Sequence, residues 1–266
     1  MTDLMKNSVT NLLGADHPWV GSIHYYDTIV STNDEAKRLA EKGAPHGTVL
    51  IAGCQTGGRG RMGRSFHSPA GSGIYLTVIL RPRCNASALM HLTCGCGVAV
   101  CDAIEKSTGF RPGVKWINDI VAQRKKLGGI LTELSLASDG FVRYAVIGIG
   151  LNCKRSAFPE ELQGVAVSLE TVLGKAVSVP GLTASLIREL YRLSLSLGDH
   201  KAVMDRYRKD CVTLGNEICV IRNDETIPGT AIALDDDGVL VVQTATGEQI
   251  RVGSGEVQVR GLFGYC

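Results

Sequence analysis

The sequence predicts an α/β protein with antiparallel strands, followed by a small β-barrel at its carboxyl end. Apolar runs at 114–121, 127–136 and 141–151 are separated by short polar turns, which is typical of antiparallel hairpins. From residue 214 onward the strands become short and alternating, with Gly-containing turns between them. A hydrophobic content of 44% and a charged content of 20% fit an ordinary globular chain of 266 residues.

The first part of the chain alternates strands and helices. A strand is expected at 22–30, and Thr32 with Glu35 then fits a capping box that opens a helix of about ten residues, ended by Gly43 and Pro45. Apolar periodicity predicts further strands at 48–52 and 73–80, and helices at 86–107, 182–197 and 201–211.

The carboxyl-terminal pattern predicts five short strands at 217–222, 230–234, 239–243, 249–252 and 256–260. The acidic triplet 235–237, followed by Gly238, is interpreted as a solvated turn between two of them. We therefore expect two domains, 1–212 and 213–266.

Four glycines and three arginines are interleaved from Gly57 to Arg64, between two predicted strands. Glycines let backbone N–H groups approach a ligand, and guanidinium groups bind phosphate or carboxylate in pairs of hydrogen bonds. No Asp or Glu occurs between Lys42 and Cys101, whereas the whole chain has a net charge of only +2. The positive charge is therefore local, which indicates an anion site rather than a general nucleic-acid surface.

Other interpretations of this loop fit the sequence less well. Gly58, Gly60 and Gly63 match the dinucleotide-binding spacing, but no helix start follows them and position 83 is Arg rather than an acid. The phosphate-loop pattern ending in Gly-Lys-Ser/Thr does not occur in the sequence. A mobile or nucleic-acid-binding arginine-glycine segment stays open from the loop alone.

Nine cysteines without a Cys-x-x-Cys pair indicate reduced thiols and a cytoplasmic protein. The Cys94, Cys96 and Cys101 group lies in an apolar helical run and is interpreted as core, and no metal site is assigned to the cysteines or histidines. With no run of 18 apolar residues and no leader pattern, we expect no membrane contact.

Three further polar islands interrupt apolar strand sequence, at 115–119, 126–131 and 148–152. Burying such groups is costly unless a partner satisfies them. Either a shared ligand does so, or each island lies at a strand end in water.

In this order, the motifs resemble those of biotin protein ligases. They are Ser31-Thr32-Asn33, Gln55 with the Gly-Arg loop, the three polar islands, and Ser254-Gly255-Glu256-Val257. The resemblance covers roughly residues 22–262. It implies a class II synthetase-like catalytic domain on a mixed, mostly antiparallel sheet, and an SH3-like barrel. It also implies that biotin and MgATP form biotinyl-5′-AMP, from which biotin passes to a lysine of a biotin carboxyl carrier domain.

The resemblance also implies roles for single residues. It places biotin at Ser31, Thr32, Asn33, Gln55, Gly58, Arg59, Gly60, Arg61, Lys126 and Gly129. It places the nucleotide at Arg61, Arg64, Phe66, Lys115, Asn118, Asn152, Glu256 and Arg260. Catalysis is assigned to Arg61, Lys126, Lys115 and Asp119. These roles agree with the chemistry, because adenylation joins two anions and a cationic clamp that excludes water lowers its barrier.

The sequence departs from the family pattern at two positions. Ile117 stands where the family usually has Pro, and Phe66 where it often has Trp. About 20 residues precede the first matching strand, too few for the DNA-binding domain of bifunctional members, so we expect a monofunctional enzyme that does not bind DNA. A homodimer is left open. A lipoate ligase is the nearest enzymatic alternative, and a non-catalytic repressor or an RNA-binding module are alternatives of other classes.

Overall fold

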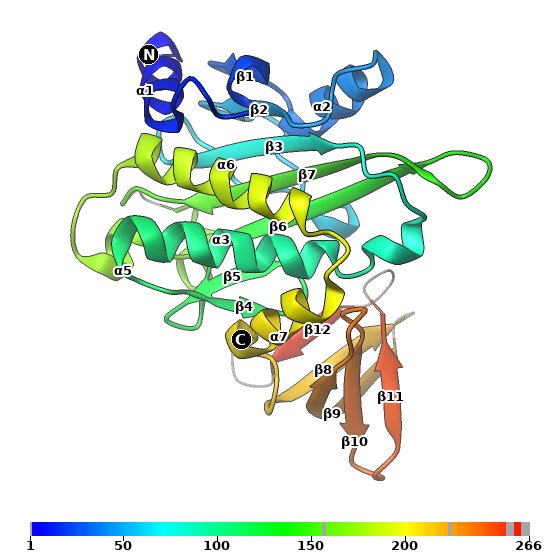
Figure 1. Ribbon diagram of the computed structural model, residues 1–266. Coiled ribbons are helices and arrows are strands. Elements are labelled where there is room, and N and C mark those ends of the chain that lie inside the picture. Colours follow the sequence, from blue (N-terminus) through cyan, green and yellow to red (C-terminus); the bar gives the residue numbers. More distant parts are fainter. Residues whose placement is uncertain (1, 156–157, 223–224, 254–257, 262–266) are drawn as a thin grey trace.

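The computed structural model describes residues 2–155, 158–222, 225–253 and 258–261, and consists of two sheets with helices (Figure 1). The larger sheet has seven strands in the order β1-β2-β3-β7-β6-β5-β4. Its β1–β2 pair is parallel and its other strand pairs are antiparallel. The strands are β1 (Ile23–Tyr26), β2 (Thr48–Ala52), β3 (Gly73–Leu80), β4 (Gly113–Lys115), β5 (Asp119–Ala122), β6 (Lys125–Leu136) and β7 (Val142–Asn152). The predicted α/β fold with a mixed, mostly antiparallel sheet is confirmed.

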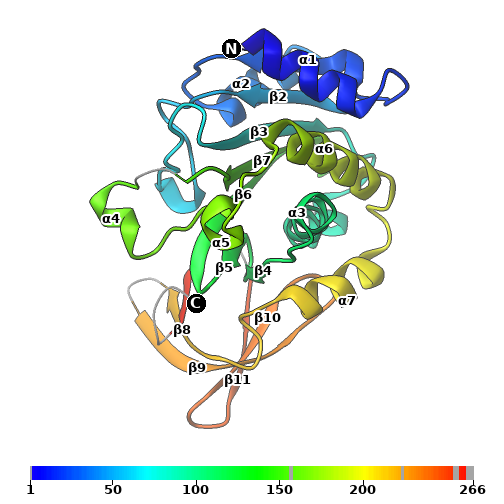
Figure 2. The same ribbon diagram turned by 90° about the vertical axis from the view of Figure 1, so that its left-hand side faces the viewer.

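Helices cover both faces of this sheet, as Figures 1 and 2 show. Helices α3 (Leu92–Thr108) and α6 (Val179–Leu195) cover one face, and α2 (Thr32–Glu41) covers the other. The other described helices are α1 (Thr2–Leu13), α4 (Glu160–Gln163), α5 (Leu169–Leu173) and α7 (His200–Asp210). Alternation along β2 separates two cores: Val49 and Ile51 join the large core under α3 and α6, whereas Leu50 packs with Ala36 and Ala40 of α2. Burial on both faces explains why β2 and β3 read as continuous apolar runs.

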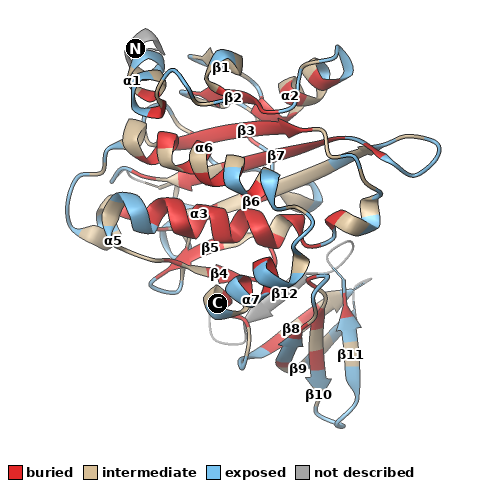
Figure 3. Ribbon diagram, viewed as in Figure 1, coloured by how far each residue is buried: buried red, intermediate tan, exposed pale blue. Residues whose placement is uncertain are grey.

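Helix α3 is the most buried of the described helices (Figure 3). By length and composition alone, Ala86–Thr108 could cross a membrane, but 78% of its apolar window is buried inside the protein. Cys94, Cys96 and Cys101 lie in this buried stretch, as predicted. Burial raises the pKa of each thiol, for Cys96 to about 12, so they stay protonated.

Several predicted boundaries are wrong. The strand expected at 22–30 ends at Tyr26, and the helix expected at 86–107 is a 3-10 turn, Ala86–Leu89, followed by α3. The single strand expected at 114–121 is two strands, β4 and β5, that fold back on each other and pair Lys115 with Asp119. Neither α1 nor the short helices α4 and α5 were predicted.

The smaller sheet is antiparallel, with the order β11-β10-β9-β8-β12. Its strands are β8 (Glu217–Arg222), β9 (Glu225–Leu234), β10 (Leu240–Thr244), β11 (Gln249–Val252) and β12 (Gln258–Gly261). Strand β9 begins five residues before the predicted strand. Its first half is not buried, so the apolar pattern of the sequence appears only in its second half. This sheet lies beside α7 and β4 of the larger part (Figure 1).

Gly47 is a strong test of the packing between the segment before β1 and the start of β2. Its φ is +83°, and a Cβ there would lie 2.1 Å from Nε1 of the buried Trp19. Left-handed strain and overpacking each cost about 1–3 kcal/mol. We expect Gly47→Ala to lower the free energy of unfolding by about 2–4 kcal/mol, measured by urea denaturation.

Gly14→Ala is the matched control. Gly14 has a φ of +86°, and a Cβ added there would meet no atom within 4 Å, so this variant reports strain without overpacking. A loss at Gly47 no larger than the loss at Gly14 would contradict the packing argument.

Candidate active site

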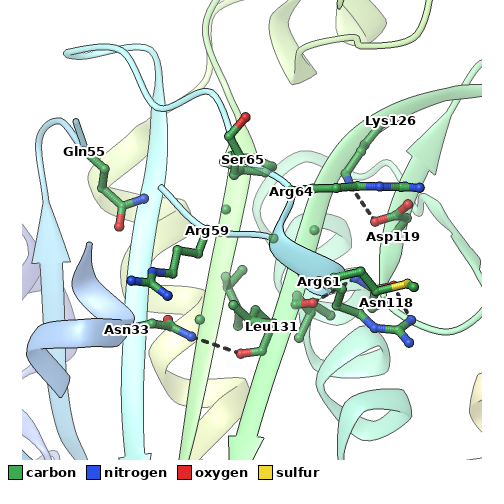
Figure 4. Close-up of a pocket in the computed structure, with 18 of the residues that line it drawn as sticks. Asn33, Gln55, Arg59, Arg61, Arg64, Ser65, Asn118, Asp119, Lys126 and Leu131 are labelled. Atoms are coloured by element: carbon green, nitrogen blue, oxygen red, sulfur yellow. Dashed lines mark hydrogen bonds and ion pairs between the residues drawn. The ribbon is translucent and has the colours of Figure 1, made fainter. Parts of the chain in front are cut away.

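A cavity of about 770 Å³ lies where α2 begins, above the middle of β6 and β7 and under the Gly-Arg loop that joins β2 to β3. Figure 4 shows side chains of this loop, of the β4–β5 turn and of β6 converging on it.

The floor of the cavity is formed by paired positions of two neighbouring strands. Gly129 on β6 pairs with Gly150 on β7, and Leu131 pairs with Gly148. A Cβ at Gly148 would lie 2.0 Å from Oδ1 of Asn33, and one at Gly150 would lie 2.4 Å from the ring of Phe66. The two β7 glycines therefore leave room for the Asn33 amide and the Phe66 ring.

A polar wall stands at one end of the cavity. The backbone N–H and the hydroxyl of Thr32 both donate to Oε1 of Gln55, at 2.8 and 3.0 Å. The hydroxyl of Thr77, which is fully buried on β3, lies 2.8 Å from both the Thr32 hydroxyl and Oδ1 of Asn33. The Asn33 amide donates to Glu133 at 2.9 Å. These side chains are held in one orientation before any ligand binds.

The N-cap of α2 is Ser31, and not Thr32 as the predicted capping box requires. The Ser31 hydroxyl accepts from the backbone N–H of Asp34 at 3.4 Å. Thr32 is the first helical residue and faces Gln55 and Thr77 instead. The predicted Thr32–Glu35 capping box is therefore wrong, because the N-cap lies one residue earlier than that box requires.

The Gly-Arg loop folds into a tight hairpin over the cavity. Gly58 accepts from the backbone N–H of Phe66 at 2.9 Å, and Gly60 donates to the carbonyl of Arg64 at 2.7 Å. At the tip, Met62 has a φ of +55° and is exposed. The side chain of Arg59 points out of the hairpin and forms an ion pair with Asp34 of α2 at 2.8 Å. This pair joins the loop to the helix that carries part of the polar wall.

Two cations of the cavity are held by the turn between β4 and β5. Arg61 donates to Oδ1 of Asn118 at 3.2 Å, and Nζ of Lys126 lies 2.6 Å from Oδ1 of Asp119 (Figure 4). Burial lowers the pKa of the half-buried Arg61, and the nearby Asp119 opposes that shift.

The lining is strongly cationic. Arg59, Arg61, Arg64, Lys115 and Lys126 line the cavity, and among its described residues Asp119 is the single carboxylate. Such a site attracts anions and stabilises negative charge away from water. Within the described part of the chain, no group of three or more His, Cys, Asp or Glu side chains is placed to hold a metal ion.

Most of the residues singled out from the sequence meet at this cavity. The lining includes Ser31, Thr32, Asn33, Gln55, Arg59, Gly60, Arg61, Arg64, Phe66, Lys115, Asn118, Asp119, Lys126 and Gly129. Gly58, within the loop, is not among the lining residues, and a Cβ there would lie 2.5 Å from the carbonyl oxygen of Phe66. Asn152, at the end of β7, donates to the carbonyl of Val167 rather than lining the cavity. Glu256 and the side chain of Arg260 lie outside the described residues.

Sequence reasoning missed other parts of the lining. Gly148 and Gly150 belong to the polar island at 148–152, but neither was assigned to the site. The signal was the alternation of glycine with Ile149, which puts both glycines on one face of the strand. Gly164 and Val165 carried no signal, because they reach the cavity only through pairing with β6: Lys126 donates to the carbonyl of Val165 at 2.7 Å.

Comparison with known proteins relates this architecture to proteins that handle biotin. Residues 25–152 match the biotin/lipoate A/B protein ligase family, and residues 213–260 match the biotin protein ligase C terminal domain. The chain is 35% identical to the bifunctional ligase/repressor BirA of Bacillus subtilis, over 84% of this chain and 70% of the relative.

A second relative and a solved structure agree. The chain is 32% identical to the biotin–[acetyl-CoA-carboxylase] ligase of Mycobacterium tuberculosis, over 92% of this chain and 91% of that one. The fold is similar to that of the biotin protein ligase from Aquifex aeolicus in complex with biotin and ATP, with a TM-score of 0.77 and 28% identity, covering 90% of this chain and 99% of that one.

Proposed function

Because this chain belongs to the biotin/lipoate A/B protein ligase family and is a ligase, we propose that it joins biotin to a lysine of a biotin carboxyl carrier domain by way of biotinyl-5′-AMP. The observation that carries the proposal is the polarity of the cavity, with a preorganised amide and hydroxyl wall at one end and charged Arg61 and Lys126 at the other.

This arrangement suits the two ends of biotin. The ureido group has donors and acceptors that match Thr32, Asn33 and Gln55, while the valerate carboxylate needs a cation. The floor at Gly129 and Leu131 suits the aliphatic chain between them. We therefore orient the ureido ring toward the α2 end and the carboxylate toward Lys126.

Adenylation then needs no covalent enzyme group. A carboxylate oxygen of biotin attacks the α-phosphorus of MgATP, an acyl–phosphate bond forms and pyrophosphate leaves. Lys126 and Arg61 stabilise the charge that gathers between the two anions. Asp119, whose Oδ1 lies 2.6 Å from Nζ of Lys126, orients the ammonium group. Magnesium enters with the nucleotide as part of the substrate.

In the second step, the neutral amine of the acceptor lysine attacks the acyl carbon, AMP leaves and an amide forms with loss of a proton. The Gly-Arg loop would protect the adenylate from water until the acceptor arrives. Phe66, packed edge-on against Tyr75 at a ring distance of 6.5 Å, offers an aromatic edge on the nucleotide side.

We also propose a domain boundary, a location and partners for this ligase. The domain boundary at 212/213 is supported by the start of the carboxyl-terminal family match at residue 213. A cytoplasmic location is supported by the free state of the eight cysteines in the described residues. We expect no DNA or membrane partner, and the carrier domain of a carboxylase as the protein substrate.

The proposed function is tested by transfer of labelled biotin, with MgATP, to a purified carrier domain, detected as acid-stable label. Label on the acceptor lysine and release of AMP and pyrophosphate are expected. Adenylation of lipoate or octanoate without turnover of biotin would identify a lipoate ligase instead.

Gly148→Ala is expected to weaken biotin binding at least 10-fold. The new Cβ would displace the Asn33 amide, which breaks its contacts with Thr77 and Glu133. The KM for ATP should change much less, because Arg61 and Lys126 lie at the other end. Steady-state kinetics with each substrate varied in turn measures both constants.

The matched control is Gly164→Ala. Gly164 also lines the cavity, but a Cβ there meets no atom within 4 Å and its φ is −78°, which any residue adopts. Equal KM values for biotin in the two variants would contradict the orientation proposed above.

A further inference from the structure

The turn between β4 and β5, which contacts both cations, is bonded on its other side to later parts of the chain. Trp116 lines the cavity and is 5% exposed, and it forms the turn between β4 and β5 together with Ile117 and Asn118. Three buried hydrogen bonds join this turn to residues at least 90 positions later in the chain.

These three bonds involve three separate segments. The backbone N–H of Trp116 donates to the hydroxyl of Thr213 at 2.8 Å, and Thr213 is the first residue of the carboxyl-terminal family match. The indole Nε1 of Trp116 donates to the carbonyl of Gly238 at 2.9 Å. The hydroxyl of Tyr207, on α7, donates to the carbonyl of Ile117 at 3.2 Å.

The turn that contains Gly238 is closely packed. Gly238 has a φ of +80°, and a Cβ there would lie 3.0 Å from Sγ of Cys94 in α3, so the turn between β9 and β10 sits tightly on the catalytic part. Arg208 of α7 fixes the same turn, donating to the carbonyl of Leu234 at 2.9 Å and pairing with Asp236 at 2.5 Å.

On the cavity side, the turn contacts Arg61 and Lys126. Asn118 accepts from Arg61, and its own amide donates to the carbonyl of Ile130 at 2.9 Å. The next residue, Asp119, pairs with Lys126. Any shift of the Trp116 backbone would therefore move the acceptors of both cations together.

We propose that Thr213 and Tyr207 are positioning residues for adenylation, which act through the Trp116–Asp119 turn on Arg61 and Lys126. The inference rests on the proposed function. Neither residue is among those that line the cavity. Each satisfies a buried backbone group of the turn, and small misplacements of a catalytic group cost large factors in rate.

We expect these positioning residues to affect adenylation but not the binding of biotin alone. The polar wall of Thr32, Asn33 and Gln55 is built on α2, β3 and the residues after β2, with no contact to Thr213 or Tyr207 in its described hydrogen-bond network. Loss of the Thr213 hydroxyl should therefore slow adenylation and raise the KM for ATP, while the affinity for biotin alone stays within a factor of two.

The test compares Thr213→Val with Thr213→Ser in the full chain. Valine keeps the shape and removes the acceptor, whereas serine restores it. We expect single-turnover adenylation to slow about 10- to 100-fold in Thr213→Val and to recover to within about threefold in Thr213→Ser. Tyr207→Phe, which removes one hydroxyl, should slow the same step. Calorimetry with biotin alone gives the binding readout.

Thr183→Val is the matched control, because Thr183 is a fully buried threonine whose hydroxyl bonds within α6, to the carbonyl of Val179 at 2.8 Å. It should leave adenylation unchanged. Wild-type rates in Thr213→Val, an equal defect in Thr213→Ser, or weaker biotin binding in step with the slower rate would each overturn the inference. An inactive wild-type protein would instead overturn the proposed function.

Discussion

Replacing Lys126 by Ala is expected to slow formation of biotinyl-5′-AMP by about 100- to 1000-fold. Lys126 lies at the start of β6, and its ammonium group lines the cavity 2.6 Å from Asp119. If it stabilises the charge that develops where the carboxylate meets the α-phosphate, its loss resembles removal of an oxyanion-hole donor, worth about 2.7–4 kcal/mol. Single-turnover formation of the adenylate, followed by rapid quench, measures the effect.

Lys125→Ala is the matched control for Lys126. Lys125 is the neighbouring residue of β6, pairs with Ala122 and is not among the lining residues. It should adenylate biotin at the wild-type rate. If Lys126→Ala were no slower than Lys125→Ala, both lysines would be ordinary surface cations, whose removal changes little.

Replacing Arg61 by Gly is expected to speed the escape of biotinyl-5′-AMP about 10- to 100-fold. Arg61 belongs to the loop that covers the cavity, and its half-buried guanidinium donates to Asn118. A charged hydrogen bond of this kind contributes about 1.5–3 kcal/mol, which here would hold the loop and the adenylate together. The released adenylate should label lysines of unrelated proteins. Dissociation is measured by trapping the adenylate with excess acceptor.

The control for Arg61→Gly must separate lost charge from added flexibility. Met62→Gly serves, because Met62 lies in the same loop and lines the same cavity without a charge, and its φ of +55° is one that glycine adopts without strain. It should retain the adenylate about as well as the wild type. Equal leakage from both variants would show that loop flexibility, and not the guanidinium, limits release.

Together these variants separate the two chemical roles. Lys126→Ala should lose mainly the rate of adenylation, and Arg61→Gly mainly the retention of its product. If both lose the same step to the same degree, the division between them is wrong, and the two cations act as one unit through Asp119, which faces both.

The sequence by itself determined the chemical character of the protein. The Gly-Arg loop, the Ser-Thr-Asn segment and the polar islands predicted an anion site, and their order predicted the family. These signals were readable because polar groups and glycines are costly in apolar strands unless a site needs them. The α2 helix and strands β2 and β3 were also predictable, because local periodicity and burial agree there.

Only the tertiary structure decided how the site is assembled. The local pattern predicted one strand at 114–121, whereas the chain turns back at Trp116, Ile117 and Asn118. Hydrogen bonds to Thr213 and Tyr207 satisfy two backbone groups of this turn, and one to Gly238 satisfies the Trp116 indole. Likewise Thr77 looked like any strand residue until β3 placed it beside Thr32 and Asn33. Apolar periodicity reports which face of an element is buried. Hydrogen bonds between residues 44 to 122 positions apart depend on strand register and on how the two sheets dock, which local sequence does not specify.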